Sequence, residues 1–253
     1  MALKSTLSSE ARRAGLLKDA REGNGVNLAD SATQFGVHPM TIRRDFELLE
    51  REGLVRRVRG GIVVIQNDPF TLRRVRHLRA KQIIAAKLLP LIPSGGVIGL
   101  DASSTVCALA EIMPADGKVT AVTNGLVAFE ALSRKPAVKA YLTGGEREEQ
   151  NLSLVGHLTQ QAFAAFHLDC SIVSALGVHA ATGTSESTLA QAAVKDAMAR
   201  SSDRVILATD ASKLDSLSHV HALTLDRVTT IVTDLDPEDD RLDPYRRLIP
   251  EIF

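Results

Sequence analysis

Six short apolar runs alternate with longer helical segments in the second part of this 253-residue chain, and this order restricts the possible folds more than any other feature. The runs cover residues 97–100, 119–122, 138–142, 170–175, 204–208 and 230–232. Most have no polar alternation, which is typical of buried parallel strands whose two faces are covered by helices. Helices are expected between them, at 104–113, 125–133, 157–166 and 188–200. The sequence therefore predicts an open, mostly parallel α/β sheet.

A different pattern precedes the sheet. Helical spacing of apolar residues predicts helices over 8–21, 28–35 and 38–53, with a short glycine-containing turn before the third. Residues 54–64 then form two β-prone runs around Gly60–Gly61, a pair able to make a two-residue hairpin turn. Three helices followed by a basic hairpin predict a winged helix-turn-helix.

The third of these helices has one apolar and one basic face. Ile42, Phe46 and Leu49 recur at helical spacing and are expected to pack inward. Residues 1–81 carry 16 Lys/Arg and 9 Asp/Glu, whereas the whole chain carries 30 of each, so this end suits a polyanion. A helical bundle with solvated arginines is the alternative, but the hairpin and the charge favour DNA. The candidate DNA-binding residues are His38, Met40, Thr41, Arg43, Arg44, Arg56, Arg57, Arg59 and Gly60.

We therefore expect a winged helix-turn-helix domain over residues 1–65, a linker over 66–80 and an effector-sensing α/β domain over 81–253. No apolar run approaches the roughly 18 residues needed to cross a bilayer, so a cytoplasmic chain without membrane contact is expected. Cys107 and Cys170 are interpreted as reduced thiols, and the seven histidines have no metal-ligand spacing. No metal and no cofactor are predicted.

Polar residues follow the expected strands, at the ends where open α/β sheets bind ligands. Ser103, Ser104 and Thr105 would lie at a helix N-terminus, whose free N–H groups can hold an anion such as phosphate. Ordinary helix caps use the same residue types, but five such clusters after successive strands favour one shared ligand site.

Three charged residues extend this candidate site. Lys213 follows a strand and is expected to meet phosphate or sugar oxygens. Glu186, in the loop before the helix at 188–200, and Lys195, on that helix, would serve as a hydroxyl acceptor and a charge partner. The candidate effector-binding residues are Asp101, Ser103, Ser104, Thr105, Thr123, Asn124, Gly144, Gly145, Gly177, Glu186, Lys195, Asp210 and Lys213.

The most specific motif, TIRRDFELLEREGLVRRVRGG at residues 41–61, resembles the recognition helix and wing of the DeoR family of bacterial sugar-metabolism repressors. This resemblance covers nearly the whole chain and implies DNA contact by Thr41, Arg43 and Arg44. It also implies a sensor similar in fold to ribose-5-phosphate isomerase and CoA-transferase-like domains, with a phosphorylated sugar or polyol whose phosphate lies at residues 101–105. In that segment this chain has DASST where the family more often has DSGTT.

The expected function is a DNA-binding transcriptional regulator, a repressor of a sugar or polyol operon that a sugar-type, phosphorylated effector releases from its operator. Its partners would be double-stranded operator DNA and a small sugar, polyol or sugar phosphate. A homodimer or homotetramer would match repeated half-sites. The alternative is an enzyme, a sugar-phosphate isomerase in which Asp101, Glu186 and Lys195 act as acid, base and electrostatic partner. The sequence leaves repression or activation open.

Overall fold

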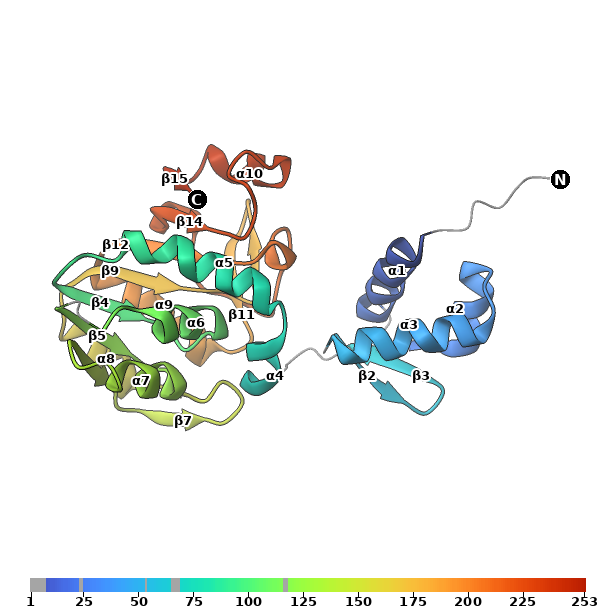
Figure 1. Ribbon diagram of the computed structural model, residues 1–253, viewed down its shortest axis with the longest axis horizontal. Helices are drawn as coiled ribbons and strands as arrows, with labels where there is room; N and C mark the ends of the chain where they lie inside the picture. The colour runs from blue at the N-terminus through green and yellow to red at the C-terminus, as the bar shows by residue number, and fades with distance from the viewer. Residues whose placement is uncertain (1–7, 23–24, 53, 65–68, 116–117) are drawn as a thin grey trace. The chain divides into compact units, whose positions relative to one another are not determined.

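The computed structural model describes residues 8–22, 25–52, 54–64, 69–115 and 118–253 (Figure 1). The chain divides into two compact units, Met1–Arg76 and His77–Phe253, and each is described by itself. Within the described ranges, no helix has the length and apolarity to span a bilayer.

The first unit is a three-helix domain with a small antiparallel sheet in the order β1-β3-β2. Its elements are α1 (Ser9–Glu22), β1 (Val26–Asn27), α2 (Leu28–Phe35), α3 (Pro39–Arg51), β2 (Val55–Val58) and β3 (Gly61–Val64). Asn27 caps α2 by accepting a hydrogen bond from the Ala29 N–H, and Gly36 ends that helix in the left-handed conformation. Leu16, Ile42, Phe46, Leu49, Val55 and Ile62 form the core of this unit. The predicted winged helix-turn-helix is confirmed.

The hairpin turn differs from the prediction by one residue. Val58 pairs with Gly61, so the turn consists of Arg59 and Gly60 and not of the two glycines. Gly60 takes the positive φ, +90°, that this turn requires. Gly61 lies in β3, where a Cβ atom would collide with the carbonyl oxygen of Val26 on β1. The second glycine is therefore needed for the close approach of a neighbouring strand.

The segment predicted to be a linker contains helical structure. Helix α4 (Phe70–Val75) lies inside it, and α5 (Leu78–Leu88) begins three residues before the expected start at Lys81. His77, with φ of +50°, separates the two helices. Residues 66–68 of the expected linker lie outside the described residues.

The second unit contains a seven-stranded parallel sheet in the order β15-β14-β12-β9-β4-β5-β6. Its strands are β4 (Val97–Leu100), β5 (Val119–Thr123), β6 (Val138–Leu142), β9 (Leu168–Val173), β12 (Ser202–Ala208), β14 (Thr230–Val232) and β15 (Glu251–Ile252). All six predicted strands are present, and the predicted open α/β sheet is confirmed. The terminal strand β15 was not predicted.

Helices cover both faces of the sheet and bury two apolar cores. Residues of α5, α6 (Ser104–Ile112) and α7 (Leu126–Ser133) share the first core, and residues of α8 (His157–Ala164), α9 (Leu189–Arg200) and α10 (Asp243–Arg246) share the second. Short 3₁₀ helices cover Leu89–Leu91, Ala211–Lys213, Leu225–Arg227 and Asp240–Leu242. Two covered faces explain why most of the strands lack a regular polar alternation.

Two small antiparallel sheets lie outside the main sheet. One pairs β7 (Glu146–Glu148) with β8 (Ser153–Val155), and the other has the order β10-β11-β13, with β10 (Gly177–His179), β11 (Gly183–Glu186) and β13 (Val220–His221). Glu186, expected in a loop, is therefore the last residue of strand β11. Pairing with Val220 on β13 fixes its backbone.

Candidate functional site

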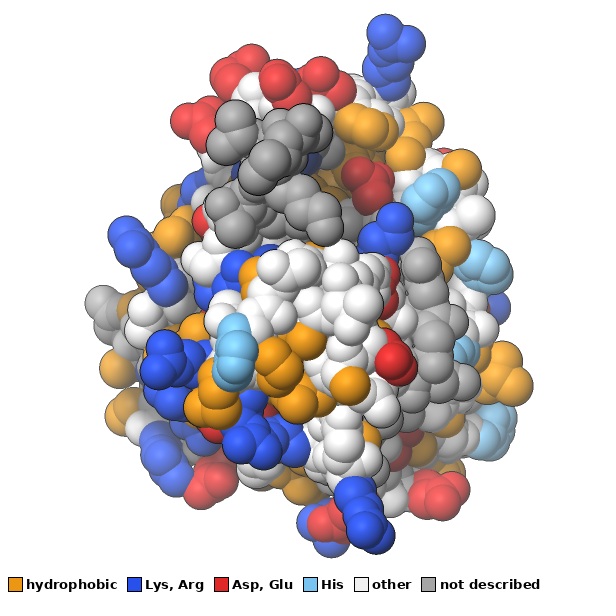
Figure 2. All heavy atoms as spheres, turned by 90° about the vertical axis from the view of Figure 1, so that its right-hand side faces the viewer, with side chains coloured by type: hydrophobic (Ala, Val, Ile, Leu, Met, Phe, Trp, Pro, Cys, Tyr) orange, Lys and Arg blue, Asp and Glu red, His pale blue; other side chains and the backbone are white. Residues whose placement is uncertain are grey.

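Helix α3 places the predicted DNA-contacting residues on its outer face. Ile42, Phe46 and Leu49 are buried, whereas His38, Met40, Arg43 and Arg44 are exposed and Thr41 is half-buried. The space-filling view shows Lys and Arg side chains lying around a group of hydrophobic side chains on one face of the molecule (Figure 2). A helix with a basic and partly apolar outer face is suited to the major groove of DNA.

A buried ion pair holds α3 against α1. The guanidinium of Arg12 donates to both carboxylate oxygens of Asp45, at 2.6 and 3.2 Å. Arg13 adds a third contact, 3.7 Å from Asp45. Asp45 follows directly after Arg44, so this ion pair fixes the orientation of the basic face. The sequence does not indicate this role, because a helical pattern does not show which charged residues will be buried.

The wing brings Arg57 to the same helix. Arg57 and Arg59 are exposed, and the Arg57 N–H donates to Glu50 of α3 at 3.0 Å. The Arg57 guanidinium also lies 3.5 Å from Glu47. The backbone of Arg56 lies in β2, but its side chain falls outside the described residues. The imidazole of His38 caps α3 by accepting a hydrogen bond from the Met40 N–H.

In the second unit, polar residues meet at the carboxyl ends of five neighbouring strands. The order of the strands reverses between β4 and β9, since β5 and β6 lie on one side and β9, β12 and β14 on the other. Ligands of open α/β sheets bind at such a switch point. The residues that follow the strands here are all buried: Thr209 and Asp210 after β12, Ser174 after β9, Asp101 after β4, Asn124 after β5 and Thr143 after β6.

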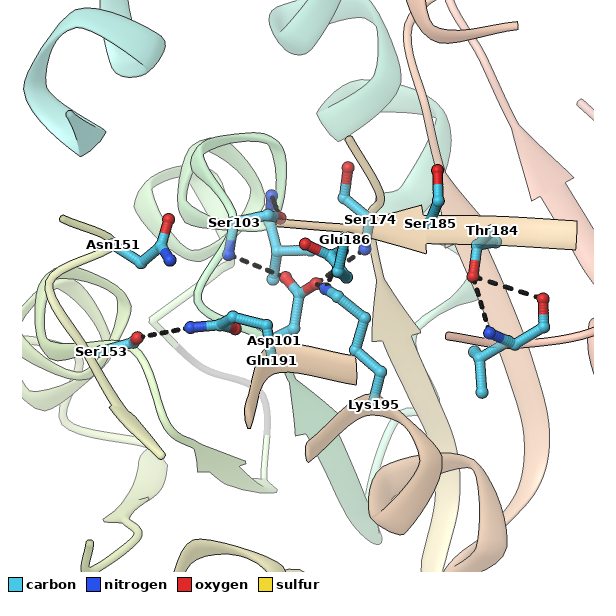
Figure 3. A network of polar contacts seen from close by, with 12 residues as sticks. Asp101, Ser103, Asn151, Ser153, Ser174, Thr184, Ser185, Glu186, Gln191 and Lys195 are labelled. Atoms are coloured by element: carbon cyan, nitrogen blue, oxygen red, sulfur yellow. Dashed lines mark hydrogen bonds and ion pairs between the residues drawn. The ribbon is translucent and has the colours of Figure 1, made fainter. Parts of the chain in front are cut away.

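A charged centre lies at the switch point itself (Figure 3). The Lys195 ammonium contacts the carboxylate of Asp101 and lies 3.3 Å from that of Glu186. Asp101 also accepts hydrogen bonds from the backbone N–H groups of Ser103 at 2.9 Å and Ser174 at 2.8 Å. These three ionisable residues are at most 6% exposed. The structure thus brings together Asp101, Glu186 and Lys195, as the sequence predicted.

Burial and charge shift the pKa values of this centre in different directions. Burial alone would raise the pKa of Asp101, but the Lys195 ammonium and three hydrogen bonds hold that pKa below its usual value. Burial raises the pKa of Glu186, and the attraction of Lys195 offsets this only in part. Burial lowers the pKa of Lys195, but the two carboxylates outweigh it and the pKa lies above its usual value. At neutral pH the centre therefore contains an ionised Asp101–Lys195 pair, and Glu186 is its most readily protonated carboxylate.

The polar contacts continue toward β12. The Lys213 ammonium donates to the Ser174 hydroxyl at 3.0 Å and lies 3.9 Å from the Asp210 carboxylate. Burial raises the pKa of Asp210, but Lys213 and a hydrogen bond from Ser212 outweigh it, so that pKa lies below its usual value. Ser174, which the sequence analysis missed, connects Lys213 to Asp101.

Several predicted site residues have local structural roles. The Ser103 hydroxyl caps α6 by accepting from the Val106 N–H, and the Thr123 hydroxyl accepts from the Gly125 N–H. A Cβ atom at Gly177 would collide with the Ser216 carbonyl oxygen. Close packing also accounts for Gly145, while Gly144 accepts a hydrogen bond from Thr159. Ser104 and Thr105 are buried in the first turn of α6.

Among the described residues of the second unit, five buried side-chain oxygen atoms have no hydrogen-bond partner. They are Thr105 Oγ1, Asn124 Oδ1, Thr143 Oγ1, Thr209 Oγ1 and Asp210 Oδ2. All five lie at the carboxyl ends of strands or in the helix turn that follows one. Buried polar atoms are nearly always paired, so this cluster marks a place where a hydrogen-bonding molecule would be stabilised. In the part of the chain that is described, no group of three His, Cys, Asp or Glu residues is placed to hold a metal ion.

A second polar group was not predicted. Glu148 of β7 accepts hydrogen bonds from the side chains of Asn151 and Gln191. The Gln191 amide also donates to the Ser153 hydroxyl at 2.9 Å. In the sequence, Glu148 lies in the charged stretch GEREEQN, which looks like a solvated loop. No local pattern shows that one of these acidic residues is turned inward.

Comparisons with known proteins agree with these two units. The model of the DeoR-like helix-turn-helix domain matches residues 12–68, and that of the DeoR C terminal sensor domain matches residues 76–235. The L-fucose operon activator of Haemophilus influenzae is 34% identical over 229 residues, which cover 89% of this chain and 92% of that protein. The glycerol-3-phosphate regulon repressor of Escherichia coli is 27% identical, covering 89% and 91%. Ribose 5-phosphate isomerase A from Neisseria gonorrhoeae is similar over 54% of this chain and 53% of that one, with 23% identity and a TM-score of 0.38.

Proposed function

This chain belongs to the DeoR family of transcriptional regulators, and on that premise we propose that it represses a sugar or polyol catabolic operon. The observation that carries the proposal is the outer face of α3, where Arg44 lies opposite a buried stripe and Thr41 and Arg43 flank that stripe, on a helix fixed by the Arg12–Asp45 ion pair. Arginine on such a helix can pair with guanine in the major groove, and the wing arginines can contact phosphates. We further propose a homodimer or homotetramer, which would place two such helices on repeated half-sites.

For the second unit we propose a sugar-type effector bound at the switch point of the sheet. The charged centre supplies both acceptors and a donor for hydroxyl groups, and the unpartnered oxygens of Asn124, Thr143 and Thr209 lie at the neighbouring strand ends. We assign a phosphate group to residues 101–105, because the backbone N–H groups of the first turn of α6 suit an anion. Effector binding would shift the ensemble away from the arrangement that binds DNA.

The two relatives described above are named an activator and a repressor, so the direction of regulation has to be measured. We propose repression, and a reporter gene placed behind the operator tests it. Higher reporter expression after deletion of the regulator supports repression, and lower expression contradicts it. Turnover of pentose phosphates by the full chain would instead support the isomerase alternative.

The DNA-binding function is tested by an Arg44→Ala variant. An operator is selected from random double-stranded DNA with the wild-type chain, and binding is followed by fluorescence anisotropy. If Arg44 reads a guanine edge, its loss weakens binding by about 1–3 kcal/mol, or roughly 5- to 150-fold. Arg134→Ala is the matched control, because Arg134 is exposed directly after α7 and pairs with Glu130 of that helix. Equal affinities of both variants and the wild type would refute the assignment.

A further inference from the structure

Glu148 is a carboxylate turned toward the interior of the second unit by neutral donors. Its Oε2 atom accepts from the amides of Asn151 and Gln191 and, at 3.4 Å, from the Ser153 hydroxyl. Its Oε1 atom has one hydrogen bond, from the Thr188 hydroxyl at 3.3 Å. Among the described residues, Glu148 forms no ion pair. Each carboxylate oxygen has about two lone-pair positions, so Oε1, with one donor, retains the capacity to accept from a further donor.

This group adjoins the charged centre through helix α9. Thr188 caps that helix, and Gln191 and Lys195 follow at spacings of three and four residues, which places them on one face. Gln191 and Lys195 are both buried. Figure 3 shows the side-chain amide of Gln191 beside the charged centre of Asp101, Glu186 and Lys195. Glu148 contacts Gln191 and Asp101 contacts Lys195, so the two carboxylates are held by successive turns of α9.

Unpartnered atoms lie at the strand ends next to the hairpin that carries Glu148. The Asn124 amide donates to the carbonyl of Leu154 on β8, yet its own Oδ1 is buried without a partner. Thr143 follows β6, directly before the two glycines that lead into β7, and its Oγ1 is also buried without a partner. Together with Glu148 Oε1, these atoms offer three acceptors and one hydroxyl donor at the ends of β5 and β6 and on the hairpin that follows them.

The chemistry of these atoms indicates the class of ligand. Carboxylate, amide and hydroxyl oxygens without a cation among them suit a molecule that donates hydrogen bonds, such as a hydroxyl-bearing carbon chain. They do not suit a phosphate, which would face the Glu148 carboxylate. The anionic part of a ligand would therefore lie away from this end of the site.

We propose that Glu148, held by Gln191, is the specificity-determining residue of the effector site and accepts a hydrogen bond from one sugar hydroxyl. This inference rests on the proposed sensing function and adds to it the residue that reads one hydroxyl of the sugar or polyol. The residue distinguishes ligands by the presence of that hydroxyl. A site built to pair a hydroxyl discriminates against the analogue that lacks it, because the half-buried carboxylate then loses that donor.

The test compares sugars with their monodeoxy analogues. D-Glucose 6-phosphate, D-fructose 6-phosphate, D-ribose 5-phosphate and sorbitol 6-phosphate are titrated into the full chain by calorimetry, and each compound that binds is compared with its deoxy forms. For the hydroxyl that meets Glu148, the wild type should bind the parent about 10- to 100-fold more tightly than the deoxy analogue. In Glu148→Gln this ratio should fall to about threefold or less.

Glu149→Gln is the matched control, because Glu149 is the next residue, is exposed and pairs with Arg147. It should keep the wild-type ratio. If Glu148 only held the hairpin in place, its substitution would lower the affinity for both compounds equally and leave the ratio unchanged. That result would overturn the proposal. If Glu148→Gln binds none of the compounds, the same ratio is measured for Glu148→Asp, which keeps the negative charge and shortens the side chain by one methylene. A reduced ratio then supports the proposal, and an unchanged ratio overturns it.

Failure of the proposed function gives a different result. A wild-type chain that binds operator DNA but none of these compounds contradicts the sensing function, and the assignment of Glu148 fails with it. A wild type that binds and discriminates while Glu148→Gln discriminates equally contradicts the role of Glu148 alone.

Discussion

Replacing Lys195 with Met should destabilise the second unit in a way that depends on pH. The substitution keeps the length of the side chain and removes the ammonium that contacts Asp101 and Glu186. Asp101 is 2% exposed, so its carboxylate would remain buried without a cation. Removing one partner of a buried ion pair costs about 3–5 kcal/mol.

The direction of the pH dependence follows from the pKa of Asp101. In the wild type this pKa is lowered, so its contribution to stability is present at neutral pH and is lost as the pH falls. In Lys195→Met burial raises the pKa of Asp101 instead, so that folding is penalised at neutral pH and the penalty disappears on acidification. The difference between the two proteins should therefore shrink on acidification, by up to about 1.4 kcal/mol per pH unit, from about 4 kcal/mol at pH 7.5 to about 2 kcal/mol at pH 5.

Urea unfolding followed by tyrosine fluorescence measures this difference. The chain has no Trp, and its two tyrosines, Tyr141 and Tyr245, both lie in the second unit, so the signal reports that unit. Lys118→Met, a substitution of an exposed lysine, is the control and should change the free energy of unfolding by less than about 0.5 kcal/mol. Equal effects of the two substitutions, or a Lys195→Met deficit that is independent of pH, would refute the reasoning.

Further predictions concern the first unit. Asp45→Asn leaves the buried Arg12 guanidinium without its carboxylate and should lower the free energy of unfolding by about 3–5 kcal/mol. The loss is measured as faster hydrogen exchange of the α3 amides. Unchanged exchange would show that the ion pair does not hold the helix. Gly61→Ala should cost about 2–3 kcal/mol, because the added methyl collides with the Val26 carbonyl and β1 has to move. Gly60→Ala has free space and only the strain of a positive φ, so it should cost about 1 kcal/mol by the same exchange measurement of the wing. A greater loss in Gly60→Ala than in Gly61→Ala would contradict this assignment.

The strands of the main sheet were predictable because their signal is local. Buried parallel strands such as Val97–Leu100 and Val138–Leu142 are short apolar runs, and the structure begins and ends them where the sequence does. The hairpin turn was misplaced by one residue because both glycines satisfy the turn geometry in isolation. The contact between Gly61 and β1 that decides the register joins residues 35 positions apart.

The candidate site was predictable where a residue type follows a strand, as for Asp101 and Asp210. Ser174 also follows a strand, but a single serine gives no distinctive signal. Glu148 and Gln191 lie 43 positions apart, and their contact depends on the placement of a hairpin against a helix. Such pairings arise from the tertiary fold, and neither the charged stretch around Glu148 nor the pattern of the helix indicates them.

The central claim is that effector binding to the second unit changes DNA binding by the first, and one titration tests it. The full chain is bound to its selected operator, the sugar phosphates named above are added, and the bound fraction is followed by fluorescence anisotropy. We expect at least one compound to release the wild type from DNA. The Lys195→Met variant should bind the same DNA and stay bound when that compound is added. A wild type whose DNA binding is unaffected by every compound, or a Lys195→Met variant that is released as readily as the wild type, would contradict the account.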